Sequence, residues 1–239
     1  MIPKAIHYCW FGGGKKPKLA KKCIESWKRF CPDYEIKEWN EDNFDFTVMP
    51  FTAEAYKAKK YAFVSDVARL LVLEKYGGIY FDTDVELIKD ISPLMNDDGF
   101  IGFENDMYVN SGQVIACVPN NPIISEMISE YEKLHFTNTD GSYNIVACPH
   151  LNSDTMERFG LIRNGKEQIV AGIHVYPSEY FNPRSSITGM LTITADTYSI
   201  HWYGKSWFSK SERIKCELAG FCRRMFGENC FDLFKRNKS

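Results

Sequence analysis

The sequence predicts an α/β protein in which a single Rossmann-like domain, a mixed sheet flanked by helices, is followed by a basic helical segment. Strand and helix signals alternate along the chain, and a helical stretch passes through paired glycines into a short apolar strand. No internal repeat or linker divides the 239 residues. A hydrophobic share of 44% is typical of one compact globular domain.

The expected elements follow from apolar spacing and from the residues that end each run. Strands are expected at residues 2–10, 34–39, 79–81, 99–104, 112–117 and 168–176, and helices at 18–29, 61–76 and 121–134. Residues 137–152 have no clear period and are expected to form a polar loop. The opening strand, helix and strand form a βαβ unit, which predicts ligands at the carboxyl ends of the strands.

The stretch from Ser65 to Glu86 carries the most chemistry. The helix that enters it has apolar residues at Tyr61, Val64, Val67, Ala68, Leu71 and Tyr76. Gly77 and Gly78 are expected to end this helix, because glycine tolerates the left-handed backbone there. The run Ile79, Tyr80 and Phe81 then predicts a short buried strand.

Two carboxylates, Asp82 and Asp84, follow this strand on either side of Thr83. Extended backbone would place both on one face of the strand, whereas a turn would bring both toward one ion. Such oxygen ligands favour Mg²⁺ or Mn²⁺. Asp66 and Arg69 are neighbours on the helix, so Arg69 either binds phosphate or holds Asp66 in place. The alternative is an ordinary acidic turn beside a helical ion pair.

Composition narrows the cellular setting and the partners. The net charge is −2 and the basic residues concentrate at one end, which argues against nucleic acid as a partner. The amino terminus lacks a charged region followed by an apolar one, and no apolar run reaches the roughly 18 residues of a membrane span. The eight cysteines show no CxxC pair. We therefore expect reduced thiols and a cytoplasmic protein.

Three motifs, in order, resemble glycosyltransferase family 32. The segment Ser65–Glu86 resembles the sugar-binding DxD region of that family, and Ile2–Gly12 resembles its opening strand, which reads IPKIIHxxWFG. His201-Trp202 and Ser206-Trp207 resemble its closing His-Trp and Ser-Trp elements. The family includes bacterial capsule and lipopolysaccharide glycosyltransferases and yeast initiating mannosyltransferases, and the clostridial glucosylating toxins are more distant relatives.

The resemblance implies a GT-A-like fold and a metal-dependent glycosyltransferase that retains anomeric configuration. The donor would be a nucleotide diphosphate sugar that carries a hexose or N-acetylhexosamine. UDP is expected as its nucleotide in preference to GDP. The acceptor would be a glycan or a polyprenyl-linked oligosaccharide in surface polysaccharide synthesis. The rival functions are a metal-dependent nucleotide-sugar hydrolase, which needs an activated water, and a non-catalytic sugar-binding protein.

The resemblance also assigns roles to residues. The catalytic set would be Asp82, Asp84, Arg69 and Asp66, and Mn²⁺ or Mg²⁺ would be held by Asp82, Asp84 and His201. The donor would contact Trp10, Asp66, Arg69, Tyr80, Asp82, Thr83, Asn110, Gln113, Lys205, Ser206 and Trp207. From the residues alone, Trp10 is equally a core side chain, and His201 a hydrogen-bonded core histidine. Two polar residues before a strand, as at Asn110 and Gln113, are also ordinary turn chemistry.

The carboxyl end differs in charge from the rest of the chain. From Lys205 to Ser239 there are nine Lys/Arg against four Asp/Glu, and we treat residues 1–208 as the catalytic domain and 209–239 as a basic amphipathic segment. Its apolar side comprises Ile214, Leu218, Phe221, Met225, Phe231 and Phe234. That side either lies on an anionic membrane or packs on the catalytic domain.

Overall fold

The computed structural model describes residues 1–204, 210–227 and 230. Its strands are β1 (Ala5–Cys9), β2 (Glu35–Trp39), β3 (Gly78–Tyr80), β4 (Val85–Leu87), β5 (Gly99–Asn105), β6 (Tyr108–Val109), β7 (Ile115–Cys117), β8 (Gln168–Val170), β9 (Ile173–Tyr176) and β10 (Ser199–His201). The main sheet has the order β2-β1-β3-β7-β5-β9-β8, with β6 beside β5, while β4 and β10 form a separate pair. Parallel and antiparallel pairs both occur, which confirms the mixed sheet.

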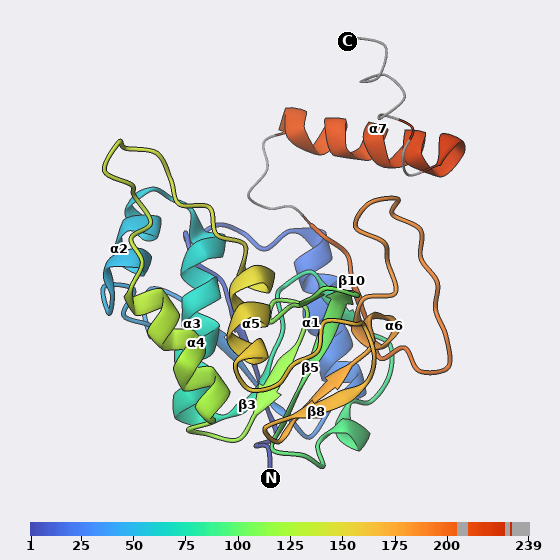
Figure 1. Ribbon diagram of the computed structural model, residues 1–239, viewed down its shortest axis with the longest axis horizontal. Coiled ribbons are helices and arrows are strands. Elements are labelled where there is room, and N and C mark those ends of the chain that lie inside the picture. Colours follow the sequence, from blue (N-terminus) through green and yellow to red (C-terminus); the bar gives the residue numbers. More distant parts are fainter. Residues whose placement is uncertain (205–209, 228–229, 231–239) are drawn as a thin grey trace.

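Helices cover both faces of this sheet (Figure 1). The helices of the described residues are α1 (Lys18–Phe30), α2 (Pro50–Lys57), α3 (Tyr61–Tyr76), α4 (Pro122–Glu132), α5 (Cys148–Glu157), α6 (Ser178–Phe181) and α7 (Lys210–Phe226), with a 3₁₀ turn at Ser92–Leu94. The α/β class expected from the sequence is therefore confirmed. Within the described ranges, no helix is long and apolar enough to cross a membrane.

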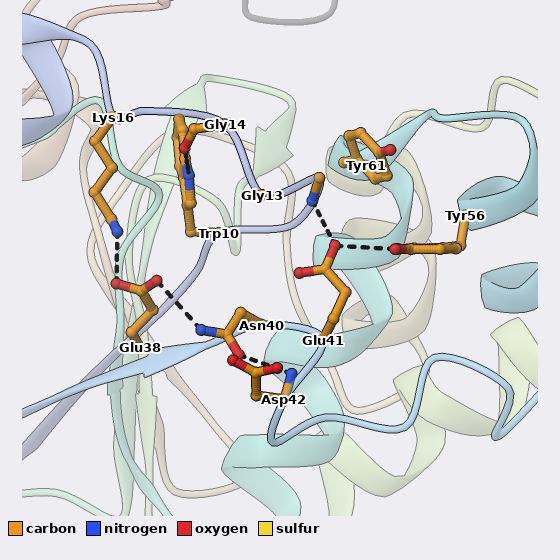
Figure 2. Close-up of a pocket in the computed structure, with 11 residues that line it drawn as sticks. Trp10, Gly13, Gly14, Lys16, Glu38, Asn40, Glu41, Asp42, Tyr56 and Tyr61 are labelled. Atoms are coloured by element: carbon orange, nitrogen blue, oxygen red, sulfur yellow. Dashed lines mark hydrogen bonds and ion pairs between the residues drawn. The ribbon is translucent and has the colours of Figure 1, made fainter.

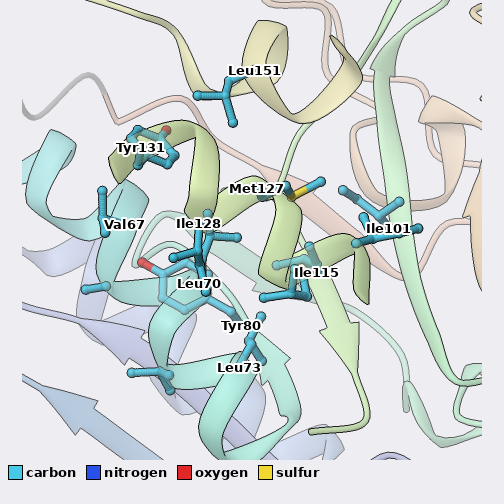
Figure 3. Packing of buried hydrophobic residues seen from close by; sticks show 14 of the residues in the cluster. Val67, Leu70, Leu73, Tyr80, Ile101, Ile115, Met127, Ile128, Tyr131 and Leu151 are labelled. Carbon is cyan, nitrogen blue, oxygen red and sulfur yellow. The ribbon is translucent and has the colours of Figure 1, made fainter. Parts of the chain in front are cut away.

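Successive side chains of the central strands enter two separate cores. Ile101 and Ile115 pack with α3, α4 and α5 on one face, where Figure 3 shows them beside Leu70 and Met127. On β5, the preceding residue Phe100 joins the second cluster, which includes residues of α1 and α6. Because side chains alternate between the two faces along each strand, those that pack in the two cores cannot line the edge of the sheet.

The glycine pair between α3 and β3 is required by both backbone conformation and space. Gly77 and Gly78 have φ of 60° and 99°. A Cβ on Gly77 would lie 2.7 Å from Cδ of Pro119, and one on Gly78 would lie 2.7 Å from the carbonyl oxygen of Ala5. The expected helix, stop and buried strand are all present, and the chain enters the Asp82–Asp84 segment from the centre of the sheet.

Two sequence expectations were wrong. The expected strand at residues 168–176 is a hairpin of β8 and β9, because Ala171 and Gly172 both take positive φ, at 45° and 86°. The expected loop at 137–152 ends in the first turns of α5, which begins at Cys148 with Pro149 in its first turn. The short strands β4 and β10 were not expected, although together they shape the site.

Candidate active site

The sheet places the opening strand and the acidic turn side by side. β1 and β3 are parallel neighbours, with Ile6 level with Ile79 and His7 level with Tyr80. The amide of Phe81 extends this register by donating to the carbonyl of His7, at 3.1 Å. Trp10, one residue beyond β1, and Asp82, two residues beyond β3, therefore leave the same edge of the sheet.

The segment Asp82–Asp84 is a turn and not a continued strand. The amide of Val85 donates to the carbonyl of Asp82 at 3.0 Å, and β4 begins at Val85. β10 pairs antiparallel with β4, so that His201 lies opposite Val85. The amide of Trp202 donates to the carbonyl of Asp84 at 2.9 Å, which ties the distant His-Trp segment to the acidic turn.

Arg69 organises one side of the turn. It is 2% exposed, and its Nη2 lies 2.9 Å from Oδ1 of Asp66 and 3.1 Å from Oδ1 of Asp82. Its Nη1 donates to the hydroxyl of Ser111 at 3.1 Å, and its guanidinium lies 4.8 Å from the ring centre of Tyr80. Of the two roles expected for Arg69, the structure shows the one in which it holds carboxylates in place.

Asp84 has different partners on the other side of the turn. Its Oδ1 lies 3.4 Å from Nε2 of His201, and its Oδ2 accepts a hydrogen bond of 2.6 Å from the amide of Gly204. The ring of His201 lies 4.2 Å from that of Tyr203. The closing His-Trp segment thus meets the acidic turn, as the sequence predicts, through Asp84.

The pKa values of the carboxylates around the turn are shifted in different directions. Burial raises the pKa of Asp66 to about 6 in spite of Arg69. Burial also raises the pKa of Asp82, against the charge of Arg69, and the charge of Asp84 adds to the rise. For Asp84, burial is outweighed by His201 and the Gly204 amide, and its pKa is lowered. The pKa of His201 is raised, because Asp84 outweighs the opposite effect of burial.

The donor atoms at the turn fit a divalent cation in kind, since two carboxylates this close favour a hard cation between them. The predicted set of Asp82, Asp84 and His201 is not assembled, however, and no group of three His, Cys, Asp or Glu side chains able to hold a metal occurs among residues 1–204, 210–227 and 230. Nε2 of His201 is directed at Asp84, and its Nδ1 is buried without a hydrogen-bond partner. An imidazole whose pKa is raised favours its protonated form, which has no lone pair for a metal.

Trp10 lines an open pocket with a volume of about 600 Å³ (Figure 2). The indole Nε1 donates to the carbonyl of Gly14 at 2.6 Å, and Nζ of Lys16 lies 5.6 Å from the ring centre. The opposite wall carries Glu38, Asn40, Glu41, Asp42, Tyr56 and Tyr61. Trp10 is half-buried and packs partly on the core, and its contact with the donor stays a prediction.

The remaining predicted donor residues differ in their access to ligand. Gln113 is fully buried and donates to the carbonyl of Phe103 at 2.9 Å, and the buried Tyr80 donates its hydroxyl to Asp82 at 3.0 Å. Asn110 is buried beside Glu104, at 3.3 Å, and Thr83 is half-buried in the turn. Lys205, Ser206 and Trp207 lie outside the described residues.

Three residues near the turn were not identified from the sequence. A Cβ on Gly112 would overlap Oδ2 of Asp82 and lie 3.1 Å from Nη1 of Arg69. Cys148, at the start of α5, accepts from Nη1 of Arg69 at 3.4 Å. Glu104, at the end of β5, accepts from the hydroxyl of Tyr203 at 3.1 Å. The sequence signal was weak, because only the tertiary fold brings Gly112 to Asp82, Cys148 to Arg69 and Glu104 to Tyr203.

The fold and this turn define an α/β protein with an acidic DXD turn at the carboxyl edge of its sheet. Residues 17–101 match the family model for the glycosyltransferase sugar-binding region containing the DXD motif. Inositol phosphoceramide mannosyltransferase 3 of Schizosaccharomyces pombe is 27% identical over 142 residues, 56% of this chain and 38% of that protein. Toxin Afp18 of Yersinia ruckeri is 35% identical over 86 residues, 33% of this chain and 4% of the toxin.

The chain thus spans less than half the length of these two curated relatives. Among solved structures, the PaToxG glycosyltransferase is 22% identical, with a TM-score of 0.47, over 66% of this chain and 69% of that chain. The assignment to the class therefore rests on the family match and on the fold and turn described above.

Proposed function

We propose that the protein transfers a hexose or N-acetylhexosamine from a nucleotide diphosphate sugar to a glycan or a polyprenyl-linked oligosaccharide. The observation that carries this proposal is the pair of carboxylates on one turn, each held by a different basic side chain at the carboxyl edge of the sheet. In a region that matches the DXD sugar-binding model, such a turn suits a sugar diphosphate.

The leaving group sets the chemistry. Cleavage of the bond to the anomeric carbon develops negative charge on the diphosphate. A divalent cation, Mn²⁺ or Mg²⁺, held by Asp84 and Asp82, would supply positive charge there. Arg69 keeps Asp82 oriented for this role and opposes the effect of burial on its pKa, and His201 keeps Asp84 oriented and lowers its pKa. Asp66, beside Arg69, is suited to accept a hydrogen bond from a sugar hydroxyl.

Transfer with retention of anomeric configuration is our proposal for the stereochemical course. No carboxylic acid is needed to protonate a diphosphate leaving group, in contrast to a glycosidase. The acceptor hydroxyl would attack from the face that the diphosphate leaves. A place in bacterial surface polysaccharide synthesis, on the cytoplasmic side of the membrane, would suit a polyprenyl-linked acceptor.

The pocket at Trp10 is the proposed site of the nucleotide base. A flat aromatic ring can stack on a base, and the volume of about 600 Å³ is adequate for a nucleotide portion. We expect Trp10→Ala to weaken donor binding by about 1–3 kcal/mol and to leave the rate of sugar transfer from the bound donor largely unchanged. Titration calorimetry with UDP and with GDP checks this, and an unchanged affinity for both would return Trp10 to a purely structural role.

A product assay separates transferase from hydrolase. Radiolabelled UDP- and GDP-sugars are incubated with the protein, Mn²⁺ and a glycan acceptor, and the label is followed into acceptor and into free sugar. We expect one donor to be consumed faster with acceptor present and its sugar to be recovered on that acceptor. Label in free sugar alone would indicate a hydrolase, and binding without turnover would indicate a sugar-binding protein.

A further inference from the structure

Helix α7 presents an apolar stripe to solvent. Ile214, Leu218, Phe221 and Met225 follow one another at intervals of four, three and four residues. At 100° per residue they fall within an arc of about 60°. Their exposed fractions are 57%, 60%, 53% and 63%. Four large apolar side chains on one arc of a single helix, all more than half exposed, form a continuous apolar surface and not scattered surface residues.

The other side of the same helix faces the catalytic domain. Lys215, Cys216, Ala219 and Arg223 line a pocket with Ser186 and Ile187, which belong to the loop that follows α6. A Cβ on Gly220 would lie 3.6 Å from the carbonyl oxygen of Ile187, an ordinary contact distance. The helix therefore meets the domain through small and polar residues. Of the two orientations expected from the sequence, packing of the apolar side on the domain is not the one observed.

Basic side chains border the apolar stripe. Lys215 and Arg224 are exposed and project about 90° to either side of its centre on the helical wheel. The segment from Lys205 onward carries nine Lys/Arg against four Asp/Glu. An apolar stripe with cationic flanks is the pattern of helices that lie in the plane of an anionic lipid surface. On such a surface, the apolar stripe enters the boundary between headgroups and acyl chains, and the flanking charges contact lipid phosphates.

We propose that α7 docks the protein on an anionic membrane surface, with Ile214, Leu218, Phe221 and Met225 inserted and Lys215 and Arg224 at the headgroups. α7 lies across the molecule on the side away from the amino terminus, beyond β10 (Figure 1). Docking in this orientation leaves the amino-terminal end of the sheet facing away from the lipid. The proposal does not depend on which sugar is transferred, or on whether transfer occurs.

The spacing of the stripe also suits a seam between two copies of the helix, since it alternates by four and three residues. A helix of 17 residues offers only about two heptads, which is short for a stable two-stranded coil. The flanking charges have the same sign in both copies, and lipid phosphates complement them better than a second α7 does. A dimer seam is therefore an outcome that the test must be able to reveal.

Vesicle sedimentation tests the proposal directly. The full chain is mixed with vesicles of phosphatidylcholine and phosphatidylglycerol, and in parallel with vesicles of phosphatidylcholine alone. We expect strong binding to the anionic vesicles only, and a loss of about tenfold or more in the double variant Leu218→Ser, Phe221→Ser. The double variant Lys215→Glu, Arg224→Glu should lose the preference for anionic lipid.

Matched control substitutions use Ile162→Ser and Ile169→Ser, which are each 64% exposed and lie outside α7. Thermal unfolding and nucleotide binding, measured on every variant, establish that the catalytic domain is intact. Equal vesicle binding by the wild type, the stripe variant and the control would overturn the proposal. So would the absence of vesicle binding, and a concentration-dependent dimer that the stripe variant abolishes would then identify a second copy as the occupant.

Discussion

The two carboxylates of one turn, Asp82 and Asp84, are held in opposite ways. Asp82 receives its charge partner, Arg69, from the helix that leads directly into the turn. Asp84 receives His201 from a strand more than a hundred residues further along the chain. Burial raises the pKa of Asp82, whereas His201 and a backbone amide lower the pKa of Asp84 in spite of its burial.

This difference separates two tasks. The Arg69 side is rigid and closed, since its guanidinium contacts two carboxylates, a hydroxyl and an aromatic ring. On the His201 side, the carboxylate of Asp84 makes one ion pair and accepts one hydrogen bond from a backbone amide among the described residues, and the chain continues from Gly204 into Lys205. We infer that the Arg69 side sets the geometry of the turn, and that Asp84 is the carboxylate that meets the donor diphosphate.

Removing the charge of Asp84 should have the largest effect. We expect Asp84→Asn to reduce kcat by about 100-fold or more, because stabilisation of the leaving diphosphate is lost. The fold should remain, since the amide of Gly204 keeps an oxygen acceptor. Steady-state kinetics with Asp196→Asn, an exposed carboxylate, as control checks this. Comparable losses in both variants, or full activity in Asp84→Asn, would contradict the division of tasks.

Displacing the carboxylate of Asp82 without removing it should have the second largest effect. In Gly112→Ala the new methyl group would overlap Oδ2 of Asp82, so that the carboxylate must rotate away from Arg69. We expect kcat/KM to fall by about tenfold to a hundredfold. Gly220→Ala is the matched control, because its Cβ would meet only atoms 3.6 Å away or more. Normal activity in Gly112→Ala would show that the position of Asp82 is unimportant.

Asp66 offers a stability test on the Arg69 side. Its pKa rises on folding from 3.8 to about 6, so the protonated form is favoured in the folded state. Protonation of Asp66 contributes fully to the free energy of unfolding below about pH 4, and this contribution is lost as pH rises to about 6. Asp66→Asn should therefore stabilise the protein by about 1–2 kcal/mol at pH 7 to 8 and have little effect near pH 4. Arg69 keeps Asp82 as a partner. Denaturant unfolding across pH measures the difference, and destabilisation at pH 8 would refute it.

His201 should show the smallest effect and a distinct pH dependence. Its pKa is raised above 6.5 by Asp84, so the stability from this pair is full below that pH and is lost as pH rises through the raised value. We expect His201→Gln to lower stability by about 1 kcal/mol near pH 6 and by less at alkaline pH. Melting temperatures of both proteins across this range check the trend. A difference that grows with pH would mean that the neutral ring is the stabilising form.

The same contrast explains how far the sequence could predict the site. Helix α3, the glycine pair and β3 are local, so apolar spacing and glycine conformation sufficed to place Arg69 beside Asp66 and the acidic turn after β3. The contact of Arg69 with Asp82 was not predicted. His201 was assigned by motif resemblance, but its direction toward Asp84 depends on the three-residue pairing of β4 with β10, which has no periodic signal. Gly112 was expected only as the first residue of a strand, because only the folded chain brings it against Asp82.

Elsewhere, prediction failed where turn chemistry was unusual. The hairpin of β8 and β9 turns at Ala171 and Gly172, and alanine is a poor signal for a backbone with positive φ. α5 starts within a polar segment whose apolar spacing becomes regular only later, at Leu151 and Met156. As a result Cys148, which contacts Arg69, was assigned to a loop.

The most direct test of the account is a binding titration of the wild type and Asp84→Asn with UDP and GDP, each with and without Mn²⁺. We predict that one nucleotide binds the wild type, that Mn²⁺ strengthens this binding, and that Asp84→Asn removes the Mn²⁺ effect while metal-free binding in the Trp10 pocket remains. A Mn²⁺ effect of equal size in both proteins would contradict the claim that Asp84 meets the donor diphosphate.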